Sequence, residues 1–426
     1  MKAAKFRYLI SIIIALLIGY TVGVNKIAID WHNFQPDIEV ASKEPPPSLQ
    51  SMDFSTFWAV MQKLETDYYD KTAINAQNLL NGAIVGMVNS LNDPYTVYLP
   101  PQSNTNFKQT MAGDFQGIGA ELGMKNKQIV VIAPLDGSPA AKAGIKAGDI
   151  ILRVNDQSTA GWTLDQTVNT IRGPKGTQVI LTVQHKSSSA PVPITITRDT
   201  INVKTITTWT KPVKAIADSN QSAILKSHAN DKIVYIRLSQ FGDTTQAEWV
   251  SAINHISQEL HHDSSIKGVV LDLRNNPGGY LPDAIMVASE FIKNGVVVWE
   301  QDGTGAKKAY NTSGKGLLTD VPLVVLINKG SASASEIVSG ALRDNDRAKL
   351  VGENSFGKGI VEEAEDMGNG AGLHITIAKW LTPNGTWVGN GKNGTGLKPD
   401  VIVALDPKHP SIDTQLEKAV ETVLQE

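Results

Sequence analysis

A run of apolar residues, Val321 to Ile327, leads into a turn that holds three serines, and this combination constrains the chain more than any other stretch. The turn reads Asn-Lys-Gly-Ser-Ala-Ser-Ala-Ser-Glu-Ile over 328–337, and a helical apolar pattern begins at Ile337. We therefore expect a buried strand, a tight turn and a helix. A serine at such a turn lies beside unpaired backbone N–H groups and the positive end of the helix dipole. A nucleophile and an oxyanion hole can be built together there.

The same residues have a structural interpretation. Ser333-x-x-Glu336 matches a capping box, in which the serine caps the helix and the glutamate side chain reaches back to the serine N–H. Capping boxes are much commoner than active sites, so the turn taken alone favours capping. The rest of the chain has to decide between the two interpretations.

The length and composition are those of a globular protein with more than one domain. The chain has 426 residues, enough for two or three domains, and it has no cysteine. The missing cysteines exclude disulfides, cysteine-ligated metals and a thiol nucleophile, and they fit an exported protein. The formal net charge is −3, and residues 1–26 carry basic residues but no acidic ones, so the remaining body is more acidic still. An acidic body argues against nucleic acid as a partner.

The N-terminus has the pattern of a membrane anchor. Lys2, Lys5 and Arg7 precede an apolar run from Tyr8 to Val24, which as a helix would rise about 25 Å and marginally span a bilayer. The basic flank predicts a cytoplasmic N-terminus and an exported body. A cleaved signal peptide is the alternative, but no small-residue cleavage site follows the run. We expect an uncleaved anchor over 1–26 and a polar, proline-containing linker over 27–50.

The next two segments differ in texture. Residues 51–113 are expected to be helical, because apolar residues recur at helical spacing over 54–92. Most of these apolar residues are expected to be core, and a proline turn at Asn92-Asp93-Pro94 is expected to end the second helix. From Asp114 short strands take over. Residues 114–200 resemble a PDZ domain, and the run SPAAKAGIKAGDIILRVND is the strongest part of the match.

This resemblance implies a peptide-binding module. In such a module an extended peptide adds to a sheet edge, and backbone N–H groups of a glycine-containing loop hold its terminal carboxylate. Gly117, Ile118 and Gly119 occupy that loop here, although a Gly-x-Gly sequence is also common in a plain turn before a strand. Arg172, after the amphipathic segment from Thr163 to Ile171, is expected to contact the bound tail or a neighbouring domain. A simple cation at a helix end is an equal alternative.

Residues 201–426 predict an α/β core. After a poorly patterned stretch over 201–232, strands beginning at Ile233 and Gly268 alternate with helices over roughly 247–260 and 281–293. The second strand ends in Pro277-Gly278-Gly279, where a backbone N–H can approach a substrate carbonyl because glycine has no side chain. An ordinary strand-to-helix turn is the alternative.

A general base is needed beside the serine turn. None of the eight histidines has the setting of a serine-protease histidine, and His374, in an alternating strand, is interpreted as a face residue. Lys358 lies between two glycines in an otherwise apolar stretch. A lysine removed from water can act as a general base, whereas a solvated loop lysine is the usual case. A serine working with a lysine is a known variant of the catalytic triad.

Taken together, the chain resembles the carboxyl-terminal processing proteases, a PDZ-containing family of tail-specific serine peptidases. The motifs that carry the resemblance follow one another in family order: LNDPYTVYLPP, the PDZ block, LDLRNNPGG, SASASEI, FGKG, KWLTPNG and KPDV. The resemblance implies an α+β multidomain chain with an N-terminal helical segment, a β-rich PDZ domain and an α/β serine protease core of the ClpP/crotonase type. It also implies roles for five residues: Ser333 as nucleophile, Lys358 as base, Gly279 and Ala334 as oxyanion-hole donors, and Glu336 as site support.

One residue departs from the family pattern. The family has glutamine four residues after the lysine, and this chain has Glu362. An ionised carboxylate beside Lys358 would favour the ammonium form and weaken the base. We therefore expect activity that changes with pH.

The sequence as a whole predicts a bacterial, membrane-anchored serine endopeptidase with an extracytoplasmic catalytic body and no metal or cofactor. Its partners would be protein or peptide substrates bound by their C-terminal carboxylate, and the sequence is compatible with a homo-oligomer. Two alternatives remain: a catalytically weakened adaptor that binds tails without cutting them, and an acyl-CoA enzyme of the related crotonase fold.

Overall fold

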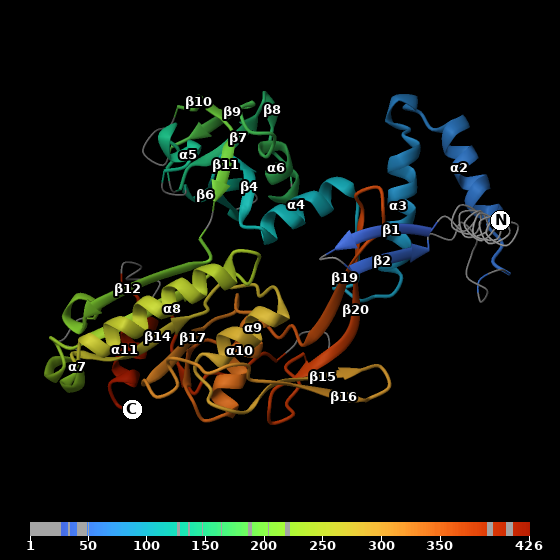
Figure 1. The fold of residues 1–426 in the computed structure, drawn as a ribbon. Helices are drawn as coiled ribbons and strands as arrows, with labels where there is room; N and C mark the ends of the chain where they lie inside the picture. Colours follow the sequence, from blue (N-terminus) through green and yellow to red (C-terminus); the bar gives the residue numbers. More distant parts are fainter. Residues whose placement is uncertain are drawn as a thin grey trace, which may run out of the picture. The chain divides into compact units, whose positions relative to one another are not determined.

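The computed structural model describes residues 27–32, 35–40, 49, 51–125, 128–134, 137–146, 148–162, 164–185, 190–202, 204–217, 222–389, 395–405 and 412–426. The expected anchor over 1–26 therefore lies outside the described residues, as do residues 33–34, 41–48 and 50 of the expected linker. Among the helices that are described, none combines the length and the apolar character needed to cross a bilayer. The chain divides into two compact units, residues 1–80 and 81–426, whose elements are labelled in Figure 1.

The first unit contains a hairpin and helices. Strands β1 (Ile27–His32) and β2 (Gln35–Val40) pair antiparallel within the stretch expected to be a linker. Helix α2 (Ser55–Asp67) and the short η2 (Lys71–Ala73) lead to α3 (Ala76–Asn89), which continues into the second unit. The helices lie where the spacing predicted them. The expectation that their apolar residues are mostly core is wrong, because α2 buries none of its residues and Trp58 is 62% exposed.

Residues 114–202 form a small β domain. Strands β5 (Ala120–Lys125), β6 (Gln128–Pro134), β7 (Ile150–Val154), β9 (Gln178–Gln184) and β10 (Val192–Thr197) form a sheet in the order β10-β9-β7-β6-β5, with β8 (Gln157–Ser158) on β7. Strand β4 (Asp114–Gly117) pairs with β11 (Asp199–Asn202), and α5 (Pro139–Lys142) and α6 (Leu164–Ile171) complete the domain. Strand β5 is an edge strand, and α6 lies against it. A buried apolar cluster that includes Val131, Ile151 and Leu181 holds the domain together.

The larger core sheet carries the serine turn. Its strands are β12 (Ile206–Pro212), β13 (Lys232–Leu238), β14 (Ile266–Asp272), β17 (Leu323–Ile327), β18 (Lys349–Gly352) and β21 (Val401–Ile402), in that order. Strands β13 to β21 pair in parallel, and only β12 is antiparallel to its neighbour. The parallel strands and the strand–turn–helix at 323–344 confirm the α/β core expected from the sequence.

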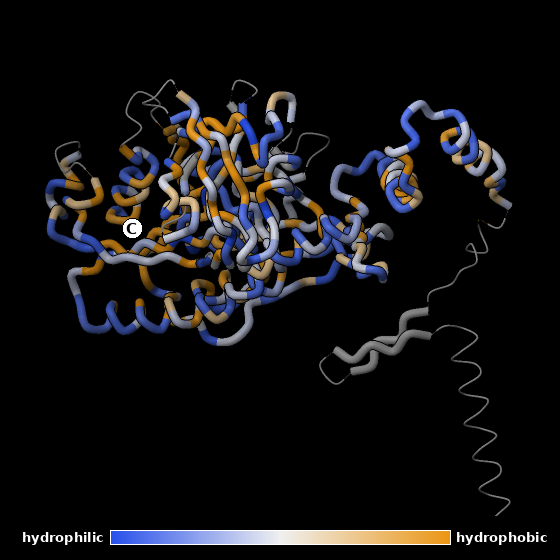
Figure 2. Tube along the Cα trace, turned by 90° about the horizontal axis from the view of Figure 1, so that it is seen from above, coloured by the Kyte–Doolittle hydropathy of each residue, from blue (hydrophilic) through white to orange (hydrophobic). Residues whose placement is uncertain are grey.

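Helices cover both faces of this sheet. On one face, α8 (Thr245–His262), α9 (Leu281–Ser289) and α10 (Ala334–Asp344) pack on alternate strand residues such as Ile236 and Val325. On the other, α7 (Ala223–Ser227) and α11 (Thr414–Val423) pack on residues such as Val270 and Val324. In Figure 2 hydrophobic residues gather in the interior of the trace and hydrophilic residues lie mostly toward its outside. Burial on both faces explains why the strands read as continuous apolar runs.

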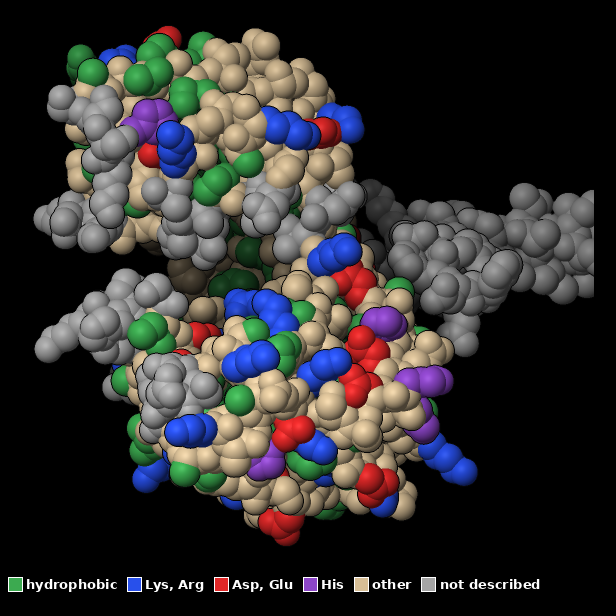
Figure 3. All heavy atoms as spheres, turned by 90° about the vertical axis from the view of Figure 1, so that its left-hand side faces the viewer, with side chains coloured by type: hydrophobic (Ala, Val, Ile, Leu, Met, Phe, Trp, Pro, Cys, Tyr) green, Lys and Arg blue, Asp and Glu red, His purple; other side chains and the backbone are tan. Residues whose placement is uncertain are grey.

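A second sheet brings distant segments to the site. It has the order β16 (Lys307–Asn311), β15 (Val296–Asp302), β20 (Gly372–Leu381) and β19 (Ile360–Asp366), and β3 (Val97–Leu99) pairs with β20. Helix α4 (Pro101–Met111) follows β3, and η3 (Val213–Ala215) follows β12. The face shown in Figure 3 carries acidic and basic side chains side by side, and neither sign forms a continuous stripe there.

Candidate active site

Ser333 stands at a strained position between β17 and α10. It is the N-cap residue of α10, with φ +53° and ψ −116°. A positive φ in a residue other than glycine costs on the order of 1–3 kcal/mol and persists only where surrounding contacts impose it. Two neighbouring serines supply such contacts: Ser331 Oγ donates to the Leu273 carbonyl at 2.8 Å, and Ser335 Oγ donates to the Asn276 carbonyl at 2.9 Å.

Glu336 connects the serine turn to the loop of residues 355–358, which carries Lys358. Its carboxylate is fully buried and accepts the backbone N–H of Ser333 at 2.9 Å. It also accepts the Ser355 hydroxyl at 2.6 Å and the N–H groups of Gly357 and Lys358 at 2.7 and 2.9 Å. Burial raises the pKa of Glu336, and these donors oppose the rise. Each carboxylate oxygen serves two donors, so the contact with Ser333 is part of a larger connection and not only a helix cap.

The Gly278–Gly279 turn lies against the serine turn. The φ angles of Gly278 and Gly279 are +98° and +137°. A Cβ on Gly278 would come within 2.9 Å of the Ala334 nitrogen, and one on Gly279 within 1.7 Å of the Phe241 carbonyl oxygen. Both positions therefore require glycine. The Phe241 N–H donates to the Gly278 carbonyl, and the Tyr280 N–H donates to the Phe241 carbonyl.

Two backbone donors next to Ser333 have no protein acceptor in the described part of the chain. These are the N–H groups of Gly279 and Ala334. Ala334 is the first residue of α10, where helical N–H groups lack intrahelical partners. The two groups are available to a developing oxyanion.

Lys358 is paired with Glu362 in this structure. Its Nζ donates to Glu362 Oε2 at 2.6 Å, and the two side chains are 23% and 22% exposed. Within the described residues no hydrogen bond joins Lys358 to Ser333. The ring of Tyr95 lies 5.2 Å from Lys358 Nζ, a cation–π distance. Tyr95 comes from the proline turn before β3, which the sequence did not connect with the site.

A cavity of about 150 Å³ opens beside Ser333. Ser333, Gly279, Tyr280 and Glu362 supply part of its lining. The remainder is apolar and consists of Leu281, Ile337, Ile360, Val361 and Trp380. The arrangement can accept an apolar side chain beside a carbonyl held near Ser333.

Comparison with known proteins decides the family. The profile described as peptidase family S41 matches residues 232–403, the PDZ domain profile matches 130–185, and the profile of the activating protease CtpB N-terminal domain matches 23–103. The protein named "Probable CtpA-like serine protease" from Staphylococcus epidermidis is 37% identical over 374 residues, covering 87% of this chain and 68% of the relative. The chain belongs to peptidase family S41.

Further relatives agree with this assignment to the serine-type peptidases. A CtpA-like relative from Staphylococcus aureus is 38% identical over 356 residues, 83% of this chain and 65% of the relative. The chain therefore spans about two thirds of the length of these relatives. Among solved structures, the photosystem II D1 C-terminal processing protease is 28% identical with a TM-score of 0.55, covering 87% of this chain and 96% of the other.

His374 of this S41 peptidase lies near enough to Lys358 and Glu362 for both charges to act on its pKa. His374 lies on β20 with its ring 4.5 Å from that of Phe107, and burial lowers its pKa. The negative charge of Glu362 raises that pKa, and the positive charge of Lys358 lowers it. In the described residues, no group of His, Asp and Glu side chains is arranged to hold a metal ion.

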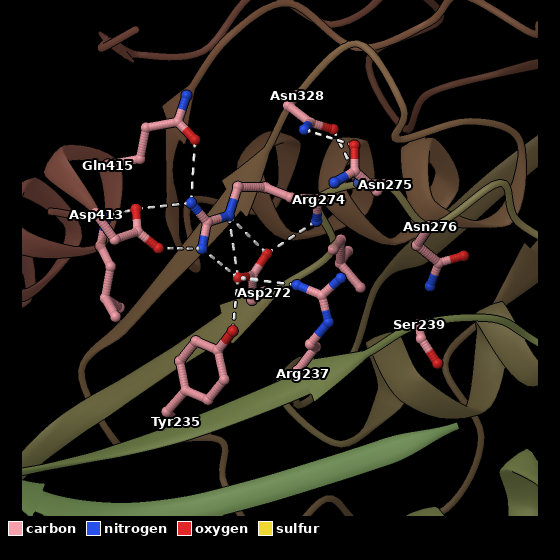
Figure 4. Close-up of polar contacts among 12 residues, drawn as sticks. Tyr235, Arg237, Ser239, Asp272, Arg274, Asn275, Asn276, Asn328, Asp413 and Gln415 are labelled. Carbon is pink, nitrogen blue, oxygen red and sulfur yellow. Dashed lines mark hydrogen bonds and ion pairs between the residues drawn. The ribbon is translucent and has the colours of Figure 1, made fainter. Parts of the chain in front are cut away.

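An ion-pair network that no sequence pattern predicted lies at the end of β14. Arg274 donates to Asp272 and to Asp413, the N-cap residue of α11, with Nη2–oxygen distances of 2.5 and 2.8 Å. The Tyr235 hydroxyl donates to Asp272 at 2.7 Å. Burial alone would lower the pKa of Arg274, but the two carboxylates raise it above its usual range. Figure 4 shows how this network ties α11 to the segment that carries the Gly278–Gly279 turn.

The expected tail-binding residues lie around the start of β5. Ile118 is buried, its carbonyl accepts the Ala140 N–H, and Gly119 has φ +72°. Arg172 is half-buried, stacks over the Phe115 ring at 5.1 Å and lies beside Gly117. Burial lowers the pKa of Arg172, and its side chain lines a polar pocket together with amide side chains of α4. Arg172 is thus more than a solvated cation at a helix end.

Proposed function

We propose that this S41 peptidase is a serine endopeptidase that captures protein C-terminal tails and cleaves them with a Ser333–Lys358 dyad. The observation that carries the proposal is the Glu336 carboxylate, which bonds the backbone of both Ser333 and Lys358. A shared buried anchor fixes the spacing of two segments whose functional side chains must cooperate. A serine and a lysine placed by chance at the surface would have no such connection.

The proposed reaction proceeds through an acyl-enzyme. Ser333 Oγ attacks the substrate carbonyl carbon while Lys358 Nζ, as the neutral amine, takes the hydroxyl proton. The N–H groups of Gly279 and Ala334 stabilise the resulting oxyanion. The C–N bond breaks, the leaving amine takes the proton from Lys358, and water then hydrolyses the ester with the same lysine as base.

The ion pair between Lys358 and Glu362 bears on this step. An ammonium has no lone pair with which to accept a proton, and Lys358 Nζ donates to Glu362 at 2.6 Å in this structure. Lys358 must lose its proton and turn toward Ser333 before the attack. We propose that the arrangement in this structure is a resting one and that substrate binding accompanies the change.

Substrate selection is proposed to have two parts. A tail would add to the open edge of β5 beside α6, with its carboxylate at Gly117, Ile118 and Gly119 and Arg172 nearby. Near the scissile bond, the apolar cavity beside Ser333 favours an apolar side chain. We further propose that residues 1–26 anchor the chain and that the catalytic body is exported.

The test uses the purified full-length chain and an unstructured protein that ends in an apolar tripeptide. Wild type should cleave it, whereas Ser333→Ala and Lys358→Ala should lose at least about 1,000-fold in kcat/KM. Amidation of the substrate C-terminus should raise KM, because the tail carboxylate is lost. Equal cleavage by wild type and both variants would refute the dyad.

A tail-binding adaptor is the second candidate, and the Lys358–Glu362 ion pair is the observation that favours it. Isothermal titration with the tail peptide separates the two functions. Binding without turnover, at any pH between 6 and 10, would support the adaptor.

A further inference from the structure

Asn276 lies between the two turns that carry the proposed oxyanion donors. It is fully buried, whereas the preceding Asn275 is exposed. Figure 4 shows Asn275 turned toward Asn328 and the amide of Asn276 pointing away from this pair. The two adjacent asparagines therefore have different surroundings, and only one of them is next to the donors.

The side chain of Asn276 fixes the glycine turn. Its Nδ2 donates to the Leu238 carbonyl at 2.8 Å, and its Oδ1 accepts the Gly278 N–H at 2.9 Å. Gly278 immediately precedes Gly279, so the bond to Gly278 sets the direction in which the next N–H points. The bond to Leu238 ties the same amide to the end of β13.

The backbone carbonyl of Asn276 fixes the serine turn. It accepts the Ala332 N–H at 3.0 Å and the Ser335 hydroxyl at 2.9 Å. Ala334 lies between these two residues. Asn276 therefore bonds Gly278, which precedes Gly279, and bonds Ala332 and Ser335, which lie on either side of Ala334. Gly279 and Ala334 carry the two N–H groups that have no acceptor among the described residues.

We propose that Asn276 is a positioning residue that sets the distance and direction between the Gly279 and Ala334 N–H groups. The proposal rests on the proposed function, since those groups matter only if they bind an oxyanion. A carboxamide is required because the site needs one donor and one acceptor on a short side chain. An ionised aspartate would offer only acceptors and would face the Leu238 carbonyl, and alanine would leave both partners unsatisfied.

The experiment compares Asn276→Asp and Asn276→Ala with the matched neighbour Asn275→Ala in the full-length chain. The readouts are kcat and KM on the tail-bearing substrate, inhibition by a peptide aldehyde, and the unfolding midpoint. A displaced oxyanion donor should lower kcat about 10- to 100-fold with KM changed less than about 3-fold. Aldehyde affinity should fall in parallel, because the hemiacetal formed with Ser333 uses the same donors. Asn275→Ala should stay within about 2-fold of wild type.

Ser335→Ala provides a milder second variant in case the Asn276 variants do not fold. It removes one bond to the Asn276 carbonyl and should lower kcat about 3- to 10-fold, with aldehyde affinity following. Folded variants with unchanged kcat and aldehyde affinity would overturn the proposal. An inactive wild type would instead refute the proposed function, so the two failures are distinguishable.

Discussion

The serine side and the lysine side of the site are built in different ways. The serine side, residues 276–279 and 328–337, is mostly buried and is held by hydrogen bonds to its backbone, including the bond from Ser333 to the Glu336 carboxylate. The lysine side, residues 93–96 and 355–362, presents Lys358 through one partly exposed ion pair with Glu362 and the ring of Tyr95. The proposed oxyanion donors are thus held by many bonds, whereas the proposed base is held by few. A fixed oxyanion hole lowers the reorganisation needed in the transition state, and a mobile base can be kept from reacting between substrates.

The sharpest test of this contrast is the same substitution at the two glutamates. Glu336→Gln should lower kcat about 100-fold, because a carboxamide NH₂ would face N–H and O–H donors that now share a carboxylate. The unfolding midpoint should fall as well. Steady-state kinetics and thermal unfolding measure the two effects, with the exposed Glu363→Gln as control. A wild-type kcat in Glu336→Gln would mean that the shared carboxylate does not determine the relative position of Ser333 and Lys358.

Glu362→Gln should raise activity, whereas Glu336→Gln should lower it. Without the ion pair, Lys358 Nζ is freer to turn toward Ser333, so kcat/KM at pH 7 should rise about 3- to 10-fold. Profiles from pH 5 to 10 for wild type, Glu362→Gln and Glu363→Gln check this. Superimposable profiles for the three proteins would contradict the idea that the ion pair restrains the base.

Tyr95 should have a smaller effect on the lysine side. Its backbone N–H donates to Asp93 Oδ1 at 3.1 Å, which helps to place its ring near Lys358. Tyr95→Leu removes the cation–π contact, worth about 0.5–2 kcal/mol, and should change kcat/KM about 2- to 5-fold. Tyr95→Phe keeps the ring and should match wild type. Tyr98→Leu serves as the stability control, because the Tyr98 hydroxyl donates to Asn81. Equal losses of kcat/KM in Tyr95→Leu and Tyr98→Leu would indicate that Tyr95 has a structural role only.

Helix α9, which follows the Gly278–Gly279 turn, contains an uncompensated carboxylate, which should affect stability and not rate. Burial, with Asp243 as the second cause, raises the pKa of Asp283 to about 6 from 3.8, and its Oδ2 has no hydrogen-bond partner among the described residues. Because the folded-state pKa is raised, the folded state holds the proton more tightly, and stability is lost as the pH rises from about 4 to 6. Discounted for partial exposure, Asp283→Asn should stabilise the protein by about 1 kcal/mol at pH 7 and little at pH 4. Urea unfolding at both pH values measures this; an equal gain at both would exclude ionisation as the cause.

The sequence predicted the serine side better than the lysine side. The strand, turn and helix at 323–344 follow from local pattern, because apolar runs and a helix start are signals within a few residues. The contact of Tyr95 with Lys358 joins positions far apart in the chain, and no local pattern reports it. The bond between Arg274 and Asp413 is likewise non-local, because its partners are 139 positions apart in the chain.

The poorly patterned stretch over 201–232 is a second region whose structure the sequence did not predict. It contains β12, an edge strand antiparallel to β13, and the short α7. Strand β12 has a single buried residue, Ile206, and its other residues are intermediate or exposed, so neither an apolar run nor a clear alternation marks it. The exposed apolar residues of α2 illustrate the converse: helical spacing identifies a face but does not say what covers it.

The backbone angle at Ser333 has a consequence for the folding of the protein apart from its chemistry. A left-handed φ of +53° is easy for glycine and unfavourable for serine. Exchanging Ser333 for glycine should therefore give a chain that is inactive and yet harder to unfold. The residue on which the proposed chemistry depends is thus expected to lower the thermal tolerance of its own fold.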